Sequence, residues 1–229
     1  MPGRTYAFGD VHGCSVALET LIAAIDPQLE DTLVFLGDFI DYGPDTKGVI
    51  ELLMGLPAWC QLVLIMGNHE EMLLEGAKSE SDRRFWLSCG GDATLKSYGQ
   101  GPTRKLPPEE HLIFIRDNVR DFFETLDHIF VHAGVDPDRS LHRQHWSKLR
   151  WEFVDRDRAR PHQSGRTVIV GHTPQVSGEV LDLGFIVLID TDCSRGSWLT
   201  ALEPFTGEVL QANQSGELRR ARLDRPPVL

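Results

Sequence analysis

The stretch "TLVFLGDFIDYGPD", residues 32–45, joins an apolar run to a loop rich in aspartate. An uncharged run of this length is typical of a strand that is covered on both faces. Gly37 and Gly43 are typical of bends at which the backbone takes a positive φ or approaches another segment closely. The stretch therefore predicts a buried strand that ends in a polar turn, with Asp38 and Asp41 at its carboxyl end.

Four other segments have the same form, an apolar run that ends in glycine beside a polar residue, at 5–10, 61–68, 128–134 and 166–172. Two helical patterns separate the first three strands, and the second of them follows Asp45, a residue suited to the N-cap. This order predicts a β-α-β-α-β unit. Because ligands gather beyond the carboxyl ends of strands in such sheets, we expect the polar residues at the strand ends to meet at one edge.

The later part of the chain predicts a second sheet. Apolar segments at 185–190, 198–204 and 208–213 follow one another without helices between them. This pattern favours antiparallel strands, with hairpin turns at Gly196 and Gly207.

A single α/β domain is expected over residues 1–229, because a chain of this length with 41% hydrophobic residues can bury a full core. Helical patterns over about 70–125 predict a helical cap beside the site. The alternating charges and paired prolines of about 216–229 predict a loosely ordered tail.

Charge and cysteine content exclude several classes of protein. Lys and Arg number 23 against 34 Asp and Glu, and the net charge of -11 argues against a general binder of nucleic acid or anionic membrane. The four cysteines form no C-x-x-C pair, so neither a zinc knuckle nor a disulfide framework is indicated. The start of the chain has no apolar leader, and no uncharged span has membrane length. We therefore expect a cytoplasmic protein without nucleic-acid or membrane partners.

The polar residues at the predicted strand ends are all oxygen or imidazole donors: Asp10, His12, Asp38, Asp41, Asn68, His69, His132 and His172. Each turn alone is equally compatible with a glycine bend or a packed histidine, but all of them in one strand context favour a metal site. Mixed oxygen and nitrogen ligands without thiolate suit manganese, iron, zinc or cobalt. Since a carboxylate can bridge two ions, we expect two divalent metal ions, with Mn²⁺ as the first choice.

Five motifs resemble, in order, the signature of the phosphoprotein phosphatase family within the calcineurin-like metallophosphoesterases: "GDVHG", "GDFIDYGP", "GNHE", "HAG" and "GHT". The resemblance spans about Tyr6 to Thr173, and "WLSCGGDATLKSYG" and "LIDTDCSRGSWLTAL" extend it to about Ala201 through similarity to bacterial members. It implies a β-sandwich flanked by helices, with a dinuclear metal centre at one edge of the sandwich.

The resemblance also implies roles for the site residues. Asp10 and His12 would bind the first metal, and Asp38 would bridge to the second. Asn68, His132 and His172 would complete that second site.

A general acid is the other component that this chemistry needs. A hydroxide activated by the two metals would attack phosphorus, and His69, which is not expected to be a ligand, would protonate the leaving oxygen. Asp41 would orient His69 and favour its protonated form. The alternatives are a local turn contact for Asp41 and a purely structural contact for His69.

Two positions depart from the family pattern. Tyr42 stands where most members have a phosphate-binding arginine, and Phe153 stands where bacterial members have a second one. A phenol donates one hydrogen bond but lacks the charged, planar fork of arginine. We expect Tyr42 to contact the substrate, with Arg150 or Arg156 supplying the missing charge unless they are solvated surface residues.

These observations predict a metal-dependent phosphatase that hydrolyses phosphomonoesters, with phosphoserine or phosphothreonine in proteins as the first choice of substrate. A hydrolase of dinucleoside polyphosphates of the diadenosine tetraphosphate type is the alternative within the same chemistry. A catalytically weak module that binds a phosphorylated partner is an alternative of another class. The expected partner is thus a phosphorylated protein or a small phosphoester.

Overall fold

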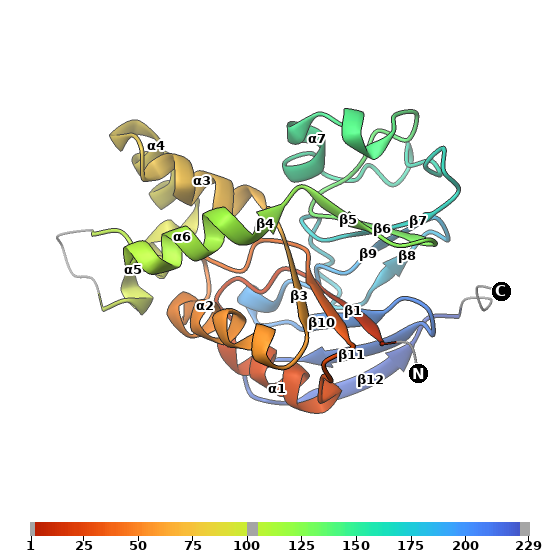
Figure 1. Ribbon diagram of the computed structural model, residues 1–229, viewed down its shortest axis with the longest axis horizontal. Coiled ribbons are helices and arrows are strands. Elements are labelled where there is room, and N and C mark those ends of the chain that lie inside the picture. The colour runs from red at the N-terminus through yellow and green to blue at the C-terminus, as the bar shows by residue number, and fades with distance from the viewer. Residues whose placement is uncertain (1–2, 100–104, 225–229) are drawn as a thin grey trace.

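The computed structural model describes residues 3–99 and 105–224. The strands form two sheets that face each other, and helices cover the outer surfaces (Figure 1). The strands are β1 (Thr5–Phe8), β2 (Thr32–Phe35), β3 (Gln61–Ile65), β4 (Val119–Arg120), β5 (Phe122–Glu124), β6 (His128–Val131), β7 (Thr167–Val170), β8 (Leu181–Asp182), β9 (Ile186–Leu188), β10 (Leu199–Glu203), β11 (Glu208–Ala212) and β12 (Leu218–Arg222). Their order is β12-β11-β10-β1-β2-β3-β4 in the larger sheet and β5-β6-β7-β9-β8 in the smaller one.

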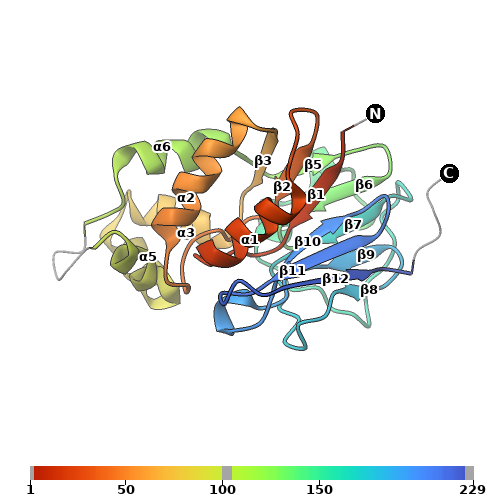
Figure 2. The same cartoon turned by 90° about the horizontal axis from the view of Figure 1, so that it is seen from below.

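The helices gather in three places. One pair lies against the larger sheet (Figure 2), a group projects from one end of the sheets, and a single short helix lies beside the smaller sheet (Figure 1). The three sets are α1 (Ser15–Ile25) and α2 (Thr46–Gly55); α3 (Asn68–Gly76), α4 (Glu80–Trp86), α5 (Asp92–Ser97) and α6 (Glu109–Asn118); and α7 (Trp146–Arg150). Short helical turns are η1 (Leu56–Ala58), η2 (Leu87–Gly91), η3 (Leu141–Arg143) and η4 (Cys193–Arg195).

Alternation along the strands explains the layered core. In β1, Phe8 packs with the cluster beneath the helices, whereas Ala7 packs in the cluster between the two sheets. In β2, Phe35 likewise packs beneath the helices and Val34 packs between the sheets. The rings of Phe8 and Phe35 stack with centroids 4.5 Å apart. Because successive side chains point to opposite faces, an uninterrupted apolar run fills both layers at once.

The predicted β-α-β-α-β unit is confirmed. β1, β2 and β3 pair in parallel, with α1 and α2 as the crossovers. The side chain of Asp45 caps α2 by accepting a hydrogen bond from the backbone N–H of Gly48 at 2.9 Å. All three strands therefore end at the same edge of the larger sheet.

The second sheet is also present, but its strands are not the predicted antiparallel set. β9 pairs in parallel with β7 in the smaller sheet, whereas β10 joins the larger sheet beside β1. Gly196 therefore forms no hairpin, because the chain crosses between sheets there through η4. The hairpin at Gly207, between β10 and β11, is confirmed.

Two predicted boundaries are wrong. The helical part of the predicted cap (about 70–125) ends at Asn118, because β4 and β5 then pair with β3 and β6. The predicted loose tail (about 216–229) contains strand β12, whose alternating charges form the exposed surface of an edge strand paired with β11. Residues 225–229 lie outside the described residues. Within the described part of the chain, no helix has the length and apolar character needed to cross a membrane.

The carboxylate of Asp31 fixes the start of the larger sheet. It accepts hydrogen bonds from the backbone and guanidinium of Arg4, at 2.7 Å and 3.1 Å, and from the backbone of Gln28 at 3.0 Å. Burial raises the pKa of Asp31, but the hydrogen bonds from Arg4 and Gln28 outweigh this effect and lower it. A carboxyl whose pKa is lowered by folding stabilises the protein above its unfolded-state pKa, and this contribution is lost as pH falls through its folded-state pKa.

We therefore predict that Asp31→Asn lowers the free energy of unfolding by about 1–2 kcal/mol at pH 7. The difference in the free energy of unfolding between the variant and the native protein should decrease as pH falls below about 4. Urea denaturation at several pH values measures both effects. Asp117→Asn, which removes an exposed ion pair with Arg116, is the matched control and should change little. An equal loss at every pH would contradict the assignment.

Candidate metal centre

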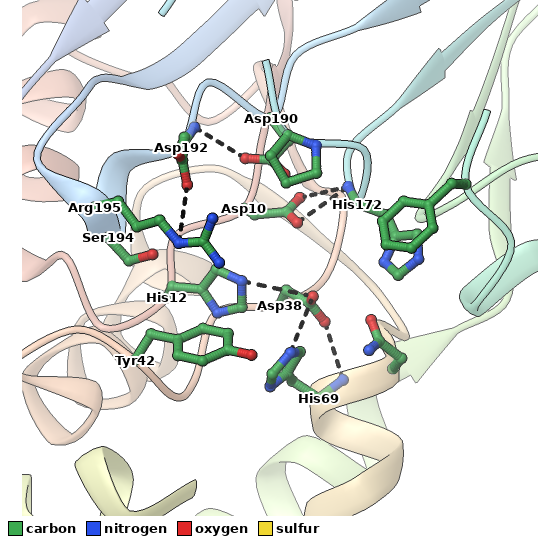
Figure 3. A pocket seen from close by; sticks show the side chains of 13 residues that line it. Asp10, His12, Asp38, Tyr42, His69, His172, Asp190, Asp192, Ser194 and Arg195 are labelled. Carbon is green, nitrogen blue, oxygen red and sulfur yellow. Dashed lines mark hydrogen bonds and ion pairs between the residues drawn. The ribbon is translucent and has the colours of Figure 1, made fainter. Parts of the chain in front are cut away.

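The carboxyl ends of six strands bring six donors to one edge of the sandwich, five of them predicted and one, Asp190, not predicted (Figure 3). Each donor follows its strand by one to three residues: Asp10 after β1, Asp38 after β2, Asn68 after β3, His132 after β6, His172 after β7 and Asp190 after β9. All but His132 line a cavity of about 200 Å³, and His132 lies directly behind it, within 2.9 Å of Asn68 Oδ1 and 3.1 Å of His172 Nδ1.

Asp38 belongs to two groups of potential metal ligands. One consists of His12, Asp38 and His69, and the other of Asp38, His132 and His172, with ligand atoms inside each group within 4.8 Å of one another. Oδ2 of Asp38 lies 3.4 Å from Nε2 of His132 and 3.7 Å from Nε2 of His12. A carboxylate in this position can serve two ions at once.

Backbone carbonyls orient the histidine rings. Nδ1 of His12 lies 2.7 Å from the carbonyl of Ile40, and Nδ1 of His132 lies 2.8 Å from that of Leu36. Each ring therefore donates through Nδ1 and presents the lone pair of Nε2 to the site. His172 is reversed, because its Nε2 faces the carbonyl of Trp151 at 2.9 Å and leaves Nδ1 free to bind.

Ionisation divides the histidines into two kinds. Burial, together with the charge of a neighbouring histidine, lowers the pKa of both His12 and His172 to about 4. Burial also opposes the charged form of His69, but Asp38 and Asp41 outweigh it and raise the pKa of His69 to about 9. His12 and His172 are therefore neutral at pH 7, as metal ligands must be, whereas His69 carries a proton that it can donate.

The carboxylates of the site fit bound cations. Burial and the charges of Asp190 and Asp38 raise the pKa of Asp10 well above its usual value. Burial raises the pKa of Asp190 to about 7, and burial with the charge of Asp38 raises that of Glu70 to about 8. So much negative charge in a buried cluster is unfavourable by itself, and two divalent cations would compensate it.

The backbone of the site is held in a sparsely populated conformation. Six of its residues have φ between +43° and +71°: His12, Asp38, Asp41, Tyr42, His172 and Asp192. Residues other than glycine avoid this left-handed region, so the surrounding contacts must hold each of them there. Concentrated strain of this kind is typical of functional sites.

Glu70 is the main such contact for the Asp38 turn. Its carboxylate accepts hydrogen bonds from the backbone N–H groups of Asp38, Phe39 and Gly67 at 2.8, 3.0 and 3.1 Å. It thereby ties the loop after β2 to the first turn of α3, where Asn68 lies.

Asp41 lies behind His69 in a fully buried network. Its Oδ2 is 2.7 Å from Nδ1 of His69, and it accepts further hydrogen bonds from Nε1 of Trp86 and Oγ1 of Thr94. The carboxylate therefore makes contacts far along the chain rather than the local turn contact considered above. Trp86 and Thr94 belong to "WLSCGGDATLKSYG", so that motif supports the Asp41–His69 pair.

The structure places only one of the three predicted substrate-binding residues at the pocket. Tyr42 lines it and is 48% exposed. Arg150 and Arg156 do not line it. Arg150 is held by Glu71 at 3.0 Å and by Asp121, and Arg156 donates to Gln175 at 2.6 Å. Their side chains are thus engaged elsewhere, and neither lines the described pocket.

Four residues of one segment line the pocket without having been predicted: Asp190, Asp192, Ser194 and Arg195. The sequence pattern for Asp190 was present, since the apolar run at 185–189 is followed by a polar residue, as are the runs of the other parallel strands. It was missed because this run was assigned to an antiparallel hairpin. Nothing local in the sequence indicates that η4 turns toward the site.

Residues 3–194 match the family model of the calcineurin-like phosphoesterases. The chain belongs to this family. Its members are metallophosphoesterases that use a dinuclear metal centre, and candidate ligands for such a centre are the ones brought together here. The sandwich of two sheets flanked by helices is the fold that the family resemblance implied.

Three similar proteins differ in how much of the chain they match. Serine/threonine-protein phosphatase 1 of Salmonella typhimurium is 42% identical over 91 residues, which cover 39% of this chain and 39% of that protein. The asymmetrical bis(5'-nucleosyl)-tetraphosphatase PrpE of Oceanobacillus iheyensis is 26% identical over 219 residues, 84% of this chain and 85% of that one. A crystal structure provisionally described as a diadenosine tetraphosphatase has a TM-score of 0.66 at 23% identity and covers 97% of this chain and 94% of that chain, which shows the shared fold.

The shared position of Asp38 leads to a prediction about metal content. Asp38→Ala should reduce bound metal from two ions per chain to fewer than one, because both ligand groups lose a donor, whereas His12→Ala should cost one ion. Elemental analysis after reconstitution with manganese and dialysis gives the count, and circular dichroism checks the fold. Asp192→Asn is the control, since Asp192 lines the pocket but lies in neither group. Loss of a single ion in Asp38→Ala would rule out a bridging role.

Proposed function

We propose that this phosphoesterase cleaves phosphate esters or anhydrides at a centre of two divalent metal ions, with Mn²⁺ as the first choice. The carrying observation is that Asp38, shared by two ligand groups, also faces the buried Asp41–His69 pair, with its Oδ2 3.9 Å from Nε2 of His69. The ligands would be the six donors expected from the motifs: Asp10, His12, Asp38, Asn68, His132 and His172.

Bound there, two divalent cations would lower the pKa of a water molecule and neutralise charge on the phosphoryl oxygens. The neutral imidazoles and the amide of Asn68 leave most of the cationic charge in place. Two cations against the carboxylates of Asp10 and Asp38 give an excess of about +2, which attracts a phosphate dianion. The net charge of -11 for the whole chain is therefore compatible with an anionic substrate.

His69 would protonate the leaving oxygen. Its imidazolium is favoured by Asp38 and by the hydrogen bond to Asp41, which also fixes the ring so that Nε2 faces the pocket. Trp86 and Thr94 hold Asp41 in turn, so the proton donor is positioned before substrate binds.

Dinucleoside polyphosphates are the first candidate for the substrate. The ring of Phe153 lines the pocket, is 65% exposed, and stacks on His172 with centroids 4.6 Å apart and planes 17° apart. An exposed aromatic face beside the metal centre suits a nucleobase. Similarity to a bis(5'-nucleosyl)-tetraphosphatase over most of both chains supports this candidate.

Phosphoserine or phosphothreonine in proteins is the second candidate. It is favoured by the 42% identity with serine/threonine-protein phosphatase 1, although that match covers 39% of each chain. The metal centre and proton donor would serve either substrate, so the distinction depends on groups at the pocket rim.

Replacement of the proton donor should separate catalysis from metal binding. We predict that His69→Asn lowers kcat by about 10²–10⁴-fold, because the leaving oxygen loses its acid, and leaves metal content within experimental error. Asp41→Asn should lower kcat less. Turnover of diadenosine tetraphosphate and metal analysis on the same preparations test this. A parallel loss of metal and activity would instead make His69 a ligand.

The substrate class can be tested at Phe153. The metal-loaded protein should release nucleotides from diadenosine tetraphosphate faster than orthophosphate from a phosphoserine peptide. Phe153→Ala should raise KM for the dinucleotide by about 5–20-fold, through loss of base stacking, with little effect on the peptide. Phe85→Ala, an exposed ring on α4, is the control. Faster peptide turnover, unaffected by Phe153→Ala, would favour the protein phosphatase instead.

A further inference from the structure

Among the residues that the structure describes at the pocket, Arg195 is the only lysine or arginine. It shares that lining with four carboxylates: Asp10, Asp38, Asp190 and Asp192. The two positions at which the family resemblance implies phosphate-binding arginines hold Tyr42 and Phe153 in this chain. Apart from the protonated His69, a positive charge at this pocket can therefore come from Arg195 alone among the described lining residues.

The backbone of η4 fixes the position of Arg195. Its N–H donates to the carbonyl of Asp192 at 3.1 Å, and Gly196 donates to the carbonyl of Cys193 at 3.0 Å. The side chain of Cys193 is buried, and the turn ends at Gly196 with φ of +91°. Because hydrogen bonds hold the backbone on both sides of Arg195, its Cα has a fixed position at the rim of the pocket.

The guanidinium itself is scarcely engaged. Within the described residues, its one ion pair joins Nε to Oδ1 of Asp192 at 3.9 Å, and the side chain is 71% exposed. This separation is longer than a hydrogen bond. The two terminal nitrogens make no hydrogen bond to any residue that the structure describes, so their donors are free within it. Arg150, in contrast, is bound by two carboxylates and lies away from the pocket.

The direction of Arg195 suits an anion over the metal ligands. In the view of Figure 3, Arg195, His12 and Tyr42 lie on one side of the pocket that all three residues line. The ring of Tyr42 lies 4.9 Å from that of His12 and 5.0 Å from that of His69, so its hydroxyl belongs to the same part of the pocket. His172, on which Phe153 stacks, lies on the opposite side (Figure 3).

We propose that Arg195, assisted by the hydroxyl of Tyr42, binds the non-bridging oxygens of the phosphate group held over the metal centre. The proposal rests on the proposed phosphohydrolase function and adds the residue that binds the substrate's anionic group. A guanidinium can donate two parallel hydrogen bonds to phosphate, and Tyr42 adds a neutral donor. The phosphate-binding arginine would thus lie on η4, in the crossover between the sheets, rather than in the loop after β2, where Tyr42 stands.

The test uses the metal-loaded protein, with Arg195→Ala, Arg195→Lys and Tyr42→Phe. Inorganic phosphate is the probe, and calorimetry measures its Kd without any need for turnover. Arg195→Ala should weaken phosphate binding and raise KM, each by about 10–100-fold, because a charged bidentate contact is lost. Metal content should be unchanged and kcat should change less than KM.

Two conservative variants should weaken phosphate binding less than Arg195→Ala does. Arg195→Lys should recover part of the phosphate affinity, since it restores charge but not the planar fork. Tyr42→Phe should weaken phosphate binding by less than tenfold, as expected for one neutral hydrogen bond. Arg84→Ala is the control, because it removes one positive charge from α4, outside the pocket.

The outcomes separate this inference from the proposed function. A phosphate Kd in Arg195→Ala within twofold of the native protein would overturn the inference, and so would loss of metal or of thermal stability in that variant. If the native protein hydrolyses no phosphoester but its phosphate affinity still depends on Arg195, the proposed function fails and the anion site remains.

Discussion

The carboxylate of Glu70 holds the site together. By accepting three backbone hydrogen bonds, it joins the turn after β2 to the start of α3. The join is tight, since a Cβ at Gly67 would lie 2.1 Å from Oδ1 of Asp38, and a Cβ at Gly37 would lie 2.7 Å from the backbone of Gly67. The two glycines are thus required for close approach, and the positive φ of Asp38 persists because this contact fixes both sides of the turn.

Under the proposed function, the histidines of this site would perform two kinds of task, metal binding and proton donation, because their hydrogen-bond partners differ. His12 and His172 are oriented by backbone carbonyls, which carry no full charge, and burial keeps them neutral. His69 is oriented by the carboxylate of Asp41, which favours its charged form despite burial. The sequence places all three at the ends of strands or turns, so only the partner of each second nitrogen distinguishes a ligand from a proton donor.

Features that depend on residues close together in the sequence could be predicted from it, whereas features that depend on contacts between distant segments could not. The parallel strands and the convergence of Asp10, Asp38 and Asn68 follow from apolar runs that end in polar turns, a pattern visible within ten residues. The engagement of Arg150 depends on Glu71 and Asp121, which approach it only in the folded chain. The parallel pairing of β9 and the ordering of β12 likewise depend on neighbours that the local pattern does not identify.

Anion binding in an acidic pocket requires positive charge to be close and poorly screened. Charges on the distant surface contribute little to anion binding, because solvent and salt screen them over about 8–10 Å. The few charged groups at the pocket therefore affect anion binding more than the net charge of -11 does. At that scale the carboxylates of Asp190 and Asp192 would oppose a phosphate, whereas bound metal ions would compensate those of Asp10 and Asp38. The guanidinium of Arg195 on η4 lies 3.9 Å from Asp192 and lines the same pocket as Asp190. An arginine there offsets the charge of its own segment and still offers donors to the substrate, which a neutral side chain in its place could not do.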